Sequence, residues 1–228
     1  MSRLTELFEE LGVHVDAQLF ELACTHRSYA YENGGLPSNE RLEFLGDAVL
    51  QIVVTDHIFR TYPDLPEGDL AKLRASVVST HALAGLAREL GLGHHVRLGK
   101  GELATGGGNK ASILADTTEA IIGAVHISGG IEAAGRFVHA LLDSRIATSQ
   151  AEGDYSDFKT ALQELTAHHG WGVPVYEVIG SGPDHQRVFN ATVIVDGDAH
   201  GMGTAPSKKL AEQRAARMAY RALNGEHA

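Results

Sequence analysis

The hydrophobic periodicity of this chain changes once, near residue 148, and that change constrains the fold more than any other feature. Before it, apolar residues recur at helical spacing, and after it come segments with the alternation of strands. We therefore predict a multidomain protein in which an all-α domain precedes an α+β domain. The predicted boundaries are residues 1–147 for the first domain, 148–155 for a small, polar linker and 156–225 for the second domain.

Each predicted domain has its own order of elements. In the first domain, helices are predicted at about residues 39–59, 67–90, 113–127 and 132–146. In the second domain, a helix at 157–168 precedes three strands and a last helix at 207–223. The strands are predicted at 173–179, at 187–195 and directly after the turn Asp196-Gly197-Asp198. The resulting order, α-β-β-β-α, favours a second domain over a tail of the first.

The chain is acidic overall, but its charge is unevenly distributed. Its 228 residues carry a formal net charge of −10, which by itself argues against a nucleic-acid partner because phosphate binders usually have a basic surface. Residues 1–151 hold 12 basic and 19 acidic side chains, a net charge of −7. The predicted last helix instead holds five basic side chains against Glu212 alone, a net charge of +4. A small, local basic surface is therefore available for phosphate.

Composition excludes several classes of protein. A single cysteine, Cys24, excludes an internal disulfide and a cysteine-based zinc knuckle. The adjacent histidine pairs at 94–95 and 168–169 lack the spacing that places two metal ligands on one helix face, so we interpret them as exposed or capping residues. No segment approaches the roughly 20 apolar residues that span a bilayer, and the N-terminus is too acidic for a signal peptide. The sequence predicts a soluble, cytoplasmic protein that does not bind membranes.

Two groups of carboxylates lie within otherwise apolar predicted helices. They are Glu40, Glu43 and Asp47 in one helix and Asp116 and Glu119 in another. The spacings of three and seven residues place each group on one helix face, where like charges repel and neighbouring core residues partly desolvate them. One interpretation is a pair of solvated faces with Arg41 and Arg74 as ion-pair partners. The other is a site for a hard divalent cation, Mg²⁺ or Mn²⁺, which all-oxygen ligands suit.

Two such groups in apolar helices favour the cation site. A divalent cation lowers the pKa of a bound water and stabilises charge on a phosphoryl group. The carboxylates therefore indicate metal-assisted hydrolysis of a phosphodiester.

The first carboxylate group lies in residues 39–49, which read Asn-Glu-Arg-Leu-Glu-Phe-Leu-Gly-Asp-Ala-Val. This segment resembles the signature of ribonuclease III, the endonuclease family that cuts double-stranded RNA. Further pieces follow the order of that family over nearly all of residues 1–147. They are Thr25-His26-Arg27-Ser28-Tyr29, Glu67-Gly68-Asp69-Leu70, Leu73-Arg74-Ala75, Lys110-Ala111-Ser112-Ile113-Leu114-Ala115-Asp116, Glu119-Ala120 and Ile122-Gly123-Ala124.

The resemblance implies roles for particular residues. Glu43, Asp116 and Glu119 would bind Mg²⁺, for which Mn²⁺ would substitute. Asp47 would be the essential carboxylate at the attacking water and the scissile phosphate, so that Asp47 and Glu119 are the expected catalytic pair. Glu40 and Glu67 match positions around the same catalytic valley.

The resemblance also implies a homodimer without an organic cofactor. Two active sites would cut opposite strands of duplex RNA, leaving 5′-phosphates, 3′-hydroxyls and short 3′ overhangs, with ribosomal and other RNA processing as the role. From the residues alone, the apolar Phe44-Leu45 segment is either a dimer interface or simply core.

The C-terminal residues resemble a double-stranded RNA-binding domain. Lys208 and Lys209 at a predicted helix N-terminus combine their charge with the helix dipole and free N–H groups, which suits phosphate. Side chains on the first helix and in a loop could reach 2′-hydroxyls in the RNA minor groove. The predicted RNA-binding residues are Thr160, Gln163, Glu164, His185, Ser207, Lys208 and Lys209.

A different function class remains open from the residues. A non-catalytic regulator would bind duplex RNA through the C-terminal domain and keep the N-terminal domain for dimerisation. Its expected mark is the loss of one or more metal-binding carboxylates, and the sequence retains all of them. The sequence therefore favours a double-stranded RNA endonuclease.

Overall fold

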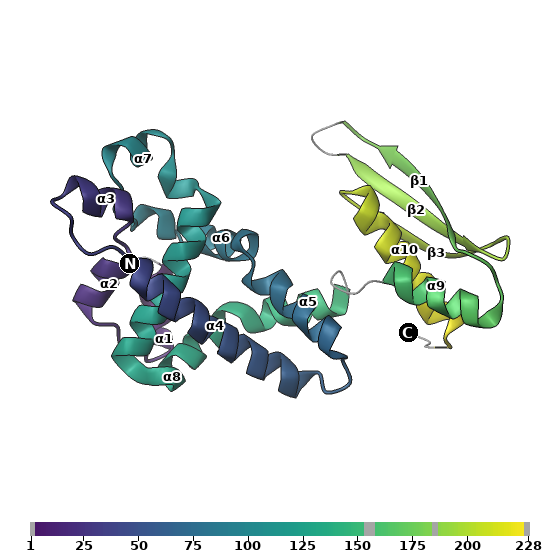
Figure 1. Ribbon diagram of the computed structural model, residues 1–228, viewed down its shortest axis with the longest axis horizontal. Coiled ribbons are helices and arrows are strands. Elements are labelled where there is room, and N and C mark those ends of the chain that lie inside the picture. Colours follow the sequence, from purple (N-terminus) through teal and green to yellow (C-terminus); the bar gives the residue numbers. More distant parts are fainter. Residues whose placement is uncertain (1–2, 153–157, 184–186, 226–228) are drawn as a thin grey trace. The chain divides into compact units, whose positions relative to one another are not determined.

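The computed structural model describes residues 3–152, 158–183 and 187–225 (Figure 1). The chain divides into two compact units, Met1–Thr148 and Ser149–Ala228. This division falls next to the boundary at which the periodicity of the sequence changes. In the described ranges, no helix is both long and apolar enough to cross a membrane.

The first unit is helical, as the sequence predicts. Its elements are α1 (Arg3–Glu10), α2 (Ala17–Ala23), α3 (Arg27–Glu32), α4 (Glu40–Thr61), α5 (Glu67–Val78), α6 (Thr80–Glu89), η1 (Leu92–His94), α7 (Lys100–Ala104), η2 (Gly107–Asn109) and α8 (Ala111–Glu152). The helix predicted at 39–59 is α4, which buries Leu42, Val49, Leu50, Val54 and Ile58. Phe44 lies off this buried face and is 82% exposed.

The single helix predicted over residues 67–90 is wrong. The chain forms two helices there, because Ser79 adopts an extended backbone (φ −63°, ψ 153°) between α5 and α6. The Ser79 hydroxyl accepts a hydrogen bond from the N–H of Ala82 at 3.4 Å and caps α6. Serine favours this capping role because its side chain competes for backbone hydrogen bonds.

The linker was predicted to begin at residue 148, but the chain is helical as far as Glu152, where α8 ends. Thr148 donates a hydrogen bond from its hydroxyl to the carbonyl of Ser144 at 2.9 Å, four residues back. Extending an existing helix adds one hydrogen bond per residue without a new nucleation cost, so weak helix formers can continue it. Within α8, Gly130 (φ 76°, ψ −176°) breaks the helical backbone between the two helices predicted at 113–127 and 132–146.

Two glycines allow α4 and α8 to touch along their backbones. A Cβ at Gly46 would lie 1.7 Å from the carbonyl oxygen of Glu119, and a Cβ at Gly123 would lie 2.4 Å from that of Leu42. Any larger residue would therefore force the helices apart. This contact fixes which turns of the two helices face each other.

The second unit is the predicted α-β-β-β-α domain. It consists of α9 (Phe158–His169), β1 (Val175–Ser181), β2 (Val188–Val195), β3 (Asp198–Ala205) and α10 (Lys208–Leu223). The strands form an antiparallel sheet in the order β1-β2-β3, with Tyr176 opposite Val193 and Thr192 opposite Met202.

Both helices pack on this sheet, and Leu162 of α9 shares a core with Ala191 of β2 and Ala215 of α10. Gly203 of β3 lies so close to α10 that a Cβ would come within 2.3 Å of the carbonyl oxygen of Ala211. The glycines ahead of the last helix thus serve helix–sheet packing.

Candidate active site

Three carboxylates from α4 and α8 converge in the first unit. Glu43 lies in the first turn of α4, and Asp116 and Glu119 lie near the start of α8. One oxygen from each side chain lies within 4.8 Å of the others, and all three residues are partly buried. The structure therefore brings together the three residues that the sequence predicts as metal ligands.

The glycine contact explains why these side chains meet. Glu43 directly follows Leu42, whose carbonyl oxygen a Cβ at Gly123 would meet. Glu119 is itself at the contact, because a Cβ at Gly46 would meet its carbonyl oxygen. Asp116 lies one further turn back on the same face of α8. Close backbone packing thus holds the like charges together.

The environment of this cluster disfavours negative charge. Burial, followed by the negative charges of Asp47, Asp116 and Glu43, raises the pKa of Glu119 from 4.5 to about 7. Burial also raises the pKa of Asp116, against the opposing charges of His26 and Arg27. A bound divalent cation would relieve both the repulsion and the desolvation.

The pKa of Glu43 is raised by burial first and then by the charges of Asp116 and Glu40. No lysine or arginine in the described ranges forms an ion pair with Glu43, Asp116 or Glu119. The alternative of ion-paired, solvated helix faces therefore fails for these three residues. Arg74, one partner proposed for them, donates instead to the hydroxyl of Thr55 at 2.9 Å.

A cleft of about 450 Å³ opens beside the cluster. Besides Glu43 and Asp116 it is lined by cationic side chains, Arg27 and Lys110, to which the sequence assigned no role. Lys110 contacts Glu102 and lies 3.0 Å from the hydroxyl of Thr105. The sequence could have pointed to these two cations only through their positions in the segments 25–29 and 110–116, which resemble ribonuclease III.

Two other carboxylates of α4, Glu40 and Asp47, lie near the cluster and are exposed. Asp47 accepts a hydrogen bond from Gln51 at 3.2 Å, and its charge is one of those that raise the pKa of Glu119. Glu40 lines the cleft, accepts a hydrogen bond from the hydroxyl of Ser38 at 2.7 Å and lies 3.9 Å from Arg27.

Glu67 lies elsewhere in the single chain. It is the exposed first residue of α5 and follows the C-terminal end of α4, whereas Glu43 lies in the first turn of that helix. A helix of 22 residues is about 33 Å long. One copy of the chain therefore does not bring Glu67 to the three converging carboxylates.

The predicted RNA-binding residues of the second unit lie at two exposed places. Thr160, Gln163 and Glu164 are exposed on α9, at spacings that place them on one face. Ser207 caps α10 by accepting a hydrogen bond from the N–H of Leu210 at 3.3 Å, and Lys208 and Lys209 are exposed in the first turn. His185 lies outside the described residues.

Comparison with known proteins decides the family of the chain. Residues 16–145, more than half of the chain, match the family model described as ribonuclease-III-like. The chain belongs to the ribonuclease III family. Residues 158–223 match the model of the double-stranded RNA binding motif. Membership confirms the predicted fold class and the predicted activity, endonucleolytic cleavage of double-stranded RNA.

Similar proteins extend over nearly the whole chain. The chain is 57% identical to Ribonuclease 3 of Thermobifida fusca, over 97% of this chain and 92% of that protein. It is also 57% identical to Ribonuclease 3 of Streptomyces coelicolor, over 96% of this chain and 79% of that protein. Among solved structures, the nuclease domain of ribonuclease III from Campylobacter jejuni is 39% identical, with a TM-score of 0.56, and covers 64% of this chain and 97% of that chain.

Proposed function

We propose that Glu43, Asp116 and Glu119 hold Mg²⁺, or Mn²⁺ in its place, and that this site hydrolyses phosphodiester bonds of duplex RNA. The observation that carries the proposal is the convergence of three partly buried carboxylates that form no ion pair with a lysine or arginine among the described residues. Their donor atoms are all oxygens, which suit a hard cation. When bound, the cation lowers the pKa of a coordinated water and offsets negative charge on the phosphate.

In this proposal the carboxylates have distinct tasks. Asp47 is exposed and within electrostatic range of Glu119, so it can accept a hydrogen bond from the attacking water and orient it toward phosphorus. The water oxygen forms a new bond to phosphorus while the bond to the 3′ oxygen breaks. The products are a 5′-phosphate and a 3′-hydroxyl. Glu40 supports the edge of the cleft through its contacts with Ser38 and Arg27.

The cations of the cleft are suited to contacts with the RNA backbone. Arg27 and Lys110 line the same cleft as Glu43 and Asp116, so phosphates next to the scissile one can pair with them. The C-terminal unit supplies further contacts through Ser207, Lys208 and Lys209 at the start of α10, through the exposed face of α9, and through His185. Such domains recognise the shape of duplex RNA more than its sequence.

We further propose that the protein acts as a homodimer. Phe44 is 82% exposed on α4, although it lies in an apolar helix next to the carboxylates, which favours an interface over core. A solved ribonuclease III nuclease domain from Campylobacter jejuni, 38% identical with a TM-score of 0.54, is described as having a region involved in dimer formation. Glu67, which one chain does not bring to the cluster, is proposed to take its place at the catalytic valley in the dimer. The proposed role is processing of ribosomal and other RNA in the cytoplasm.

Cleavage of a long, fully paired RNA tests the proposal. The full-length protein is expected to cut it with Mg²⁺ or Mn²⁺ and to bind without cutting when the divalent cation is removed. The product ends are expected to accept a 3′ adaptor without prior phosphatase treatment. Binding without cleavage under every metal condition would instead support the non-catalytic regulator.

A further inference from the structure

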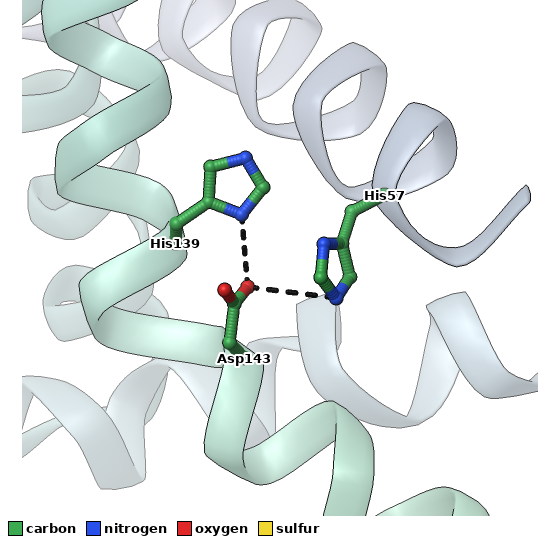
Figure 2. Close-up of side chains that lie close together, drawn as sticks. All are labelled: His57, His139 and Asp143. Carbon is green, nitrogen blue, oxygen red and sulfur yellow. Dashed lines mark hydrogen bonds and ion pairs between the residues drawn. The ribbon is translucent and has the colours of Figure 1, made fainter. Parts of the chain in front are cut away.

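A second cluster of metal-binding side chains lies between α4 and α8. His57 comes from the C-terminal half of α4, and His139 and Asp143 come from α8, beyond its break at Gly130 (Figure 2). One ligand atom of each residue lies within 4.8 Å of the others, and all three residues are partly buried. The close-up shows one nitrogen of each imidazole directed at the carboxylate of Asp143.

The distances differ from those of an ordinary hydrogen-bonded triad. Nδ1 of His139 lies 2.9 Å from Oδ1 of Asp143, and Nε2 of His57 lies 3.7 Å from the same oxygen. The second distance is too long for a hydrogen bond. Ligand atoms around a tetrahedral zinc ion are separated by about 3.3 Å, given metal–ligand distances of about 2.0 Å. The observed separations of 2.9 Å and 3.7 Å lie below and above this ligand–ligand separation, so small side-chain rotations can bring both ligand pairs to it.

We propose that His57, His139 and Asp143 form a zinc site that links α4 to the second half of α8. Two imidazole nitrogens and one carboxylate oxygen suit Zn²⁺ better than Mg²⁺, which prefers oxygen ligands alone. The side chains supply three ligands, and water completes the tetrahedron.

The surroundings of the site favour a cation. Asp143 is the one acidic member of the cluster, and it forms no ion pair with a lysine or arginine among the described residues. Asp56 and Arg60 form an ion pair at 2.8 Å and largely offset each other. The net negative charge of Asp143 is thus left for the bound ion.

This site is separate from the carboxylate cluster. His57 follows Glu43 by 14 residues on α4, a distance of about 21 Å along the helix axis. Zinc bound there would add a second link between two helices that already touch at Gly46 and Gly123. Its expected effect is on the stability of the nuclease domain, because an ion that binds only the folded state stabilises it by mass action.

The test uses full-length protein without a histidine tag, stripped of metal and then kept in excess Mg²⁺ so that the carboxylates are occupied. Titration with ZnCl₂ is followed by calorimetry and by thermal unfolding. The expected result is one zinc ion per chain and a rise in melting temperature of at least about 4 °C. Cobalt at the same site is expected to give the visible absorption of a tetrahedral centre.

His139→Gln and Asp143→Asn are each expected to weaken zinc binding at least tenfold. Both positions are partly exposed, so these variants should fold, and a normal melting temperature without zinc verifies it. His81→Ala, which removes an exposed histidine of α6, is the matched control and should bind zinc like the wild type. Absence of zinc binding by the wild type, or equal zinc affinity in the variants, would overturn the proposal.

Discussion

Both units of this protein are acidic, with net charges of −7 for residues 1–151 and −3 for residues 152–228, but they present surfaces of opposite charge to the same polyanion. The nuclease unit places Glu43, Asp116 and Glu119 within 4.8 Å of one another, in a region where residues 1–151 carry a net charge of −7. The second unit presents α10, whose net charge is +4 and whose first turn exposes two lysines. In the proposed mechanism, basic side chains of α10 attract RNA to the second unit, whereas phosphate can approach the carboxylates of the nuclease unit, beside Arg27 and Lys110, only when a cation is bound. Metal dependence and salt dependence should be separable by mutation.

The largest expected effect is on cleavage by the nuclease unit. Asp47→Asn or Glu119→Gln should lower the single-turnover rate of duplex cleavage by at least about a thousandfold, because each removes a charge at the reacting centre. Affinity for the duplex, measured by filter binding in Ca²⁺, should change less than about twofold, because the α10 contacts remain. A comparable loss of affinity would show that the two functions are not divided between the units.

Glu132→Gln is the matched control for Glu119→Gln. It makes the same change on the same helix at an exposed position outside the cluster. Its cleavage rate should equal that of the wild type.

Removing the second unit is expected to have the next largest effect. Because α8 is helical to Glu152, the truncation should remove residues 153–228. Affinity for duplex RNA should fall by about a hundredfold at moderate salt, and cleavage should survive only at low salt with Mg²⁺ or Mn²⁺. A folded truncated protein that is inactive at every salt and metal concentration would contradict a self-contained catalytic domain.

The α4–α8 contact should be sensitive to one methyl group. Gly46→Ala places a Cβ against the backbone of Glu119, so we expect a loss of about 3 kcal/mol in the free energy of unfolding and a marked loss of cleavage. Chemical denaturation measures the first effect. Gly85→Ala is the control, because a Cβ there meets nothing within 4 Å, and alanine in α6 should be neutral or slightly stabilising. Equal stability of the two variants would argue against the close helix contact.

The lysines of α10 should control the salt dependence. Replacing Lys208 and Lys209 by alanine should weaken duplex binding about tenfold and reduce the slope of log affinity against log salt by about two. The Mg²⁺ concentration that gives half-maximal cleavage of saturating RNA should not change. Arg221→Ala, at the exposed C-terminal end of the same helix, tests whether position matters more than charge and should have a smaller effect.

The smallest expected effect is the pH dependence of stability without divalent cations. Because the folded protein raises the pKa of Glu119 from 4.5 to about 7, it holds this proton more tightly than the unfolded chain. The stabilisation is therefore complete below the unfolded pKa and is lost as the pH rises through the folded one. The melting temperature should fall over this range more in the wild type than in Glu119→Gln, and Mg²⁺ should reduce the difference. Parallel curves would mean that folding does not raise the pKa of Glu119.

Sequence reasoning located the two carboxylate groups because both helices carry acidic residues among apolar ones, a pattern that is visible locally. The choice of Glu43, Asp116 and Glu119 as predicted ligands came from the resemblance to ribonuclease III. Sequence reasoning did not locate Arg27 and Lys110 in the cleft or the contact between Gly46 and Gly123, because these depend on how distant segments pack. The break at Ser79 was missed because apolar spacing continues across it.

The histidine cluster was missed for the same reason. His139 and Asp143 are visible at a spacing of four residues, but His57 joins them only through the fold. The adjacent histidine pairs at 94–95 and 168–169 are more conspicuous in the sequence, but neither pair belongs to this cluster.

Binding of Mn²⁺ to the RNA-free, full-length protein, followed by electron paramagnetic resonance, tests the metal site most directly. The wild type and His139→Gln, which retains the three carboxylates, should bind Mn²⁺ with equal affinity at the cluster. Asp116→Asn combined with Glu119→Gln should weaken this binding at least tenfold, because two of three ligands lose their charge. Unchanged Mn²⁺ affinity in the double variant would contradict the assignment of the catalytic metal to this cluster.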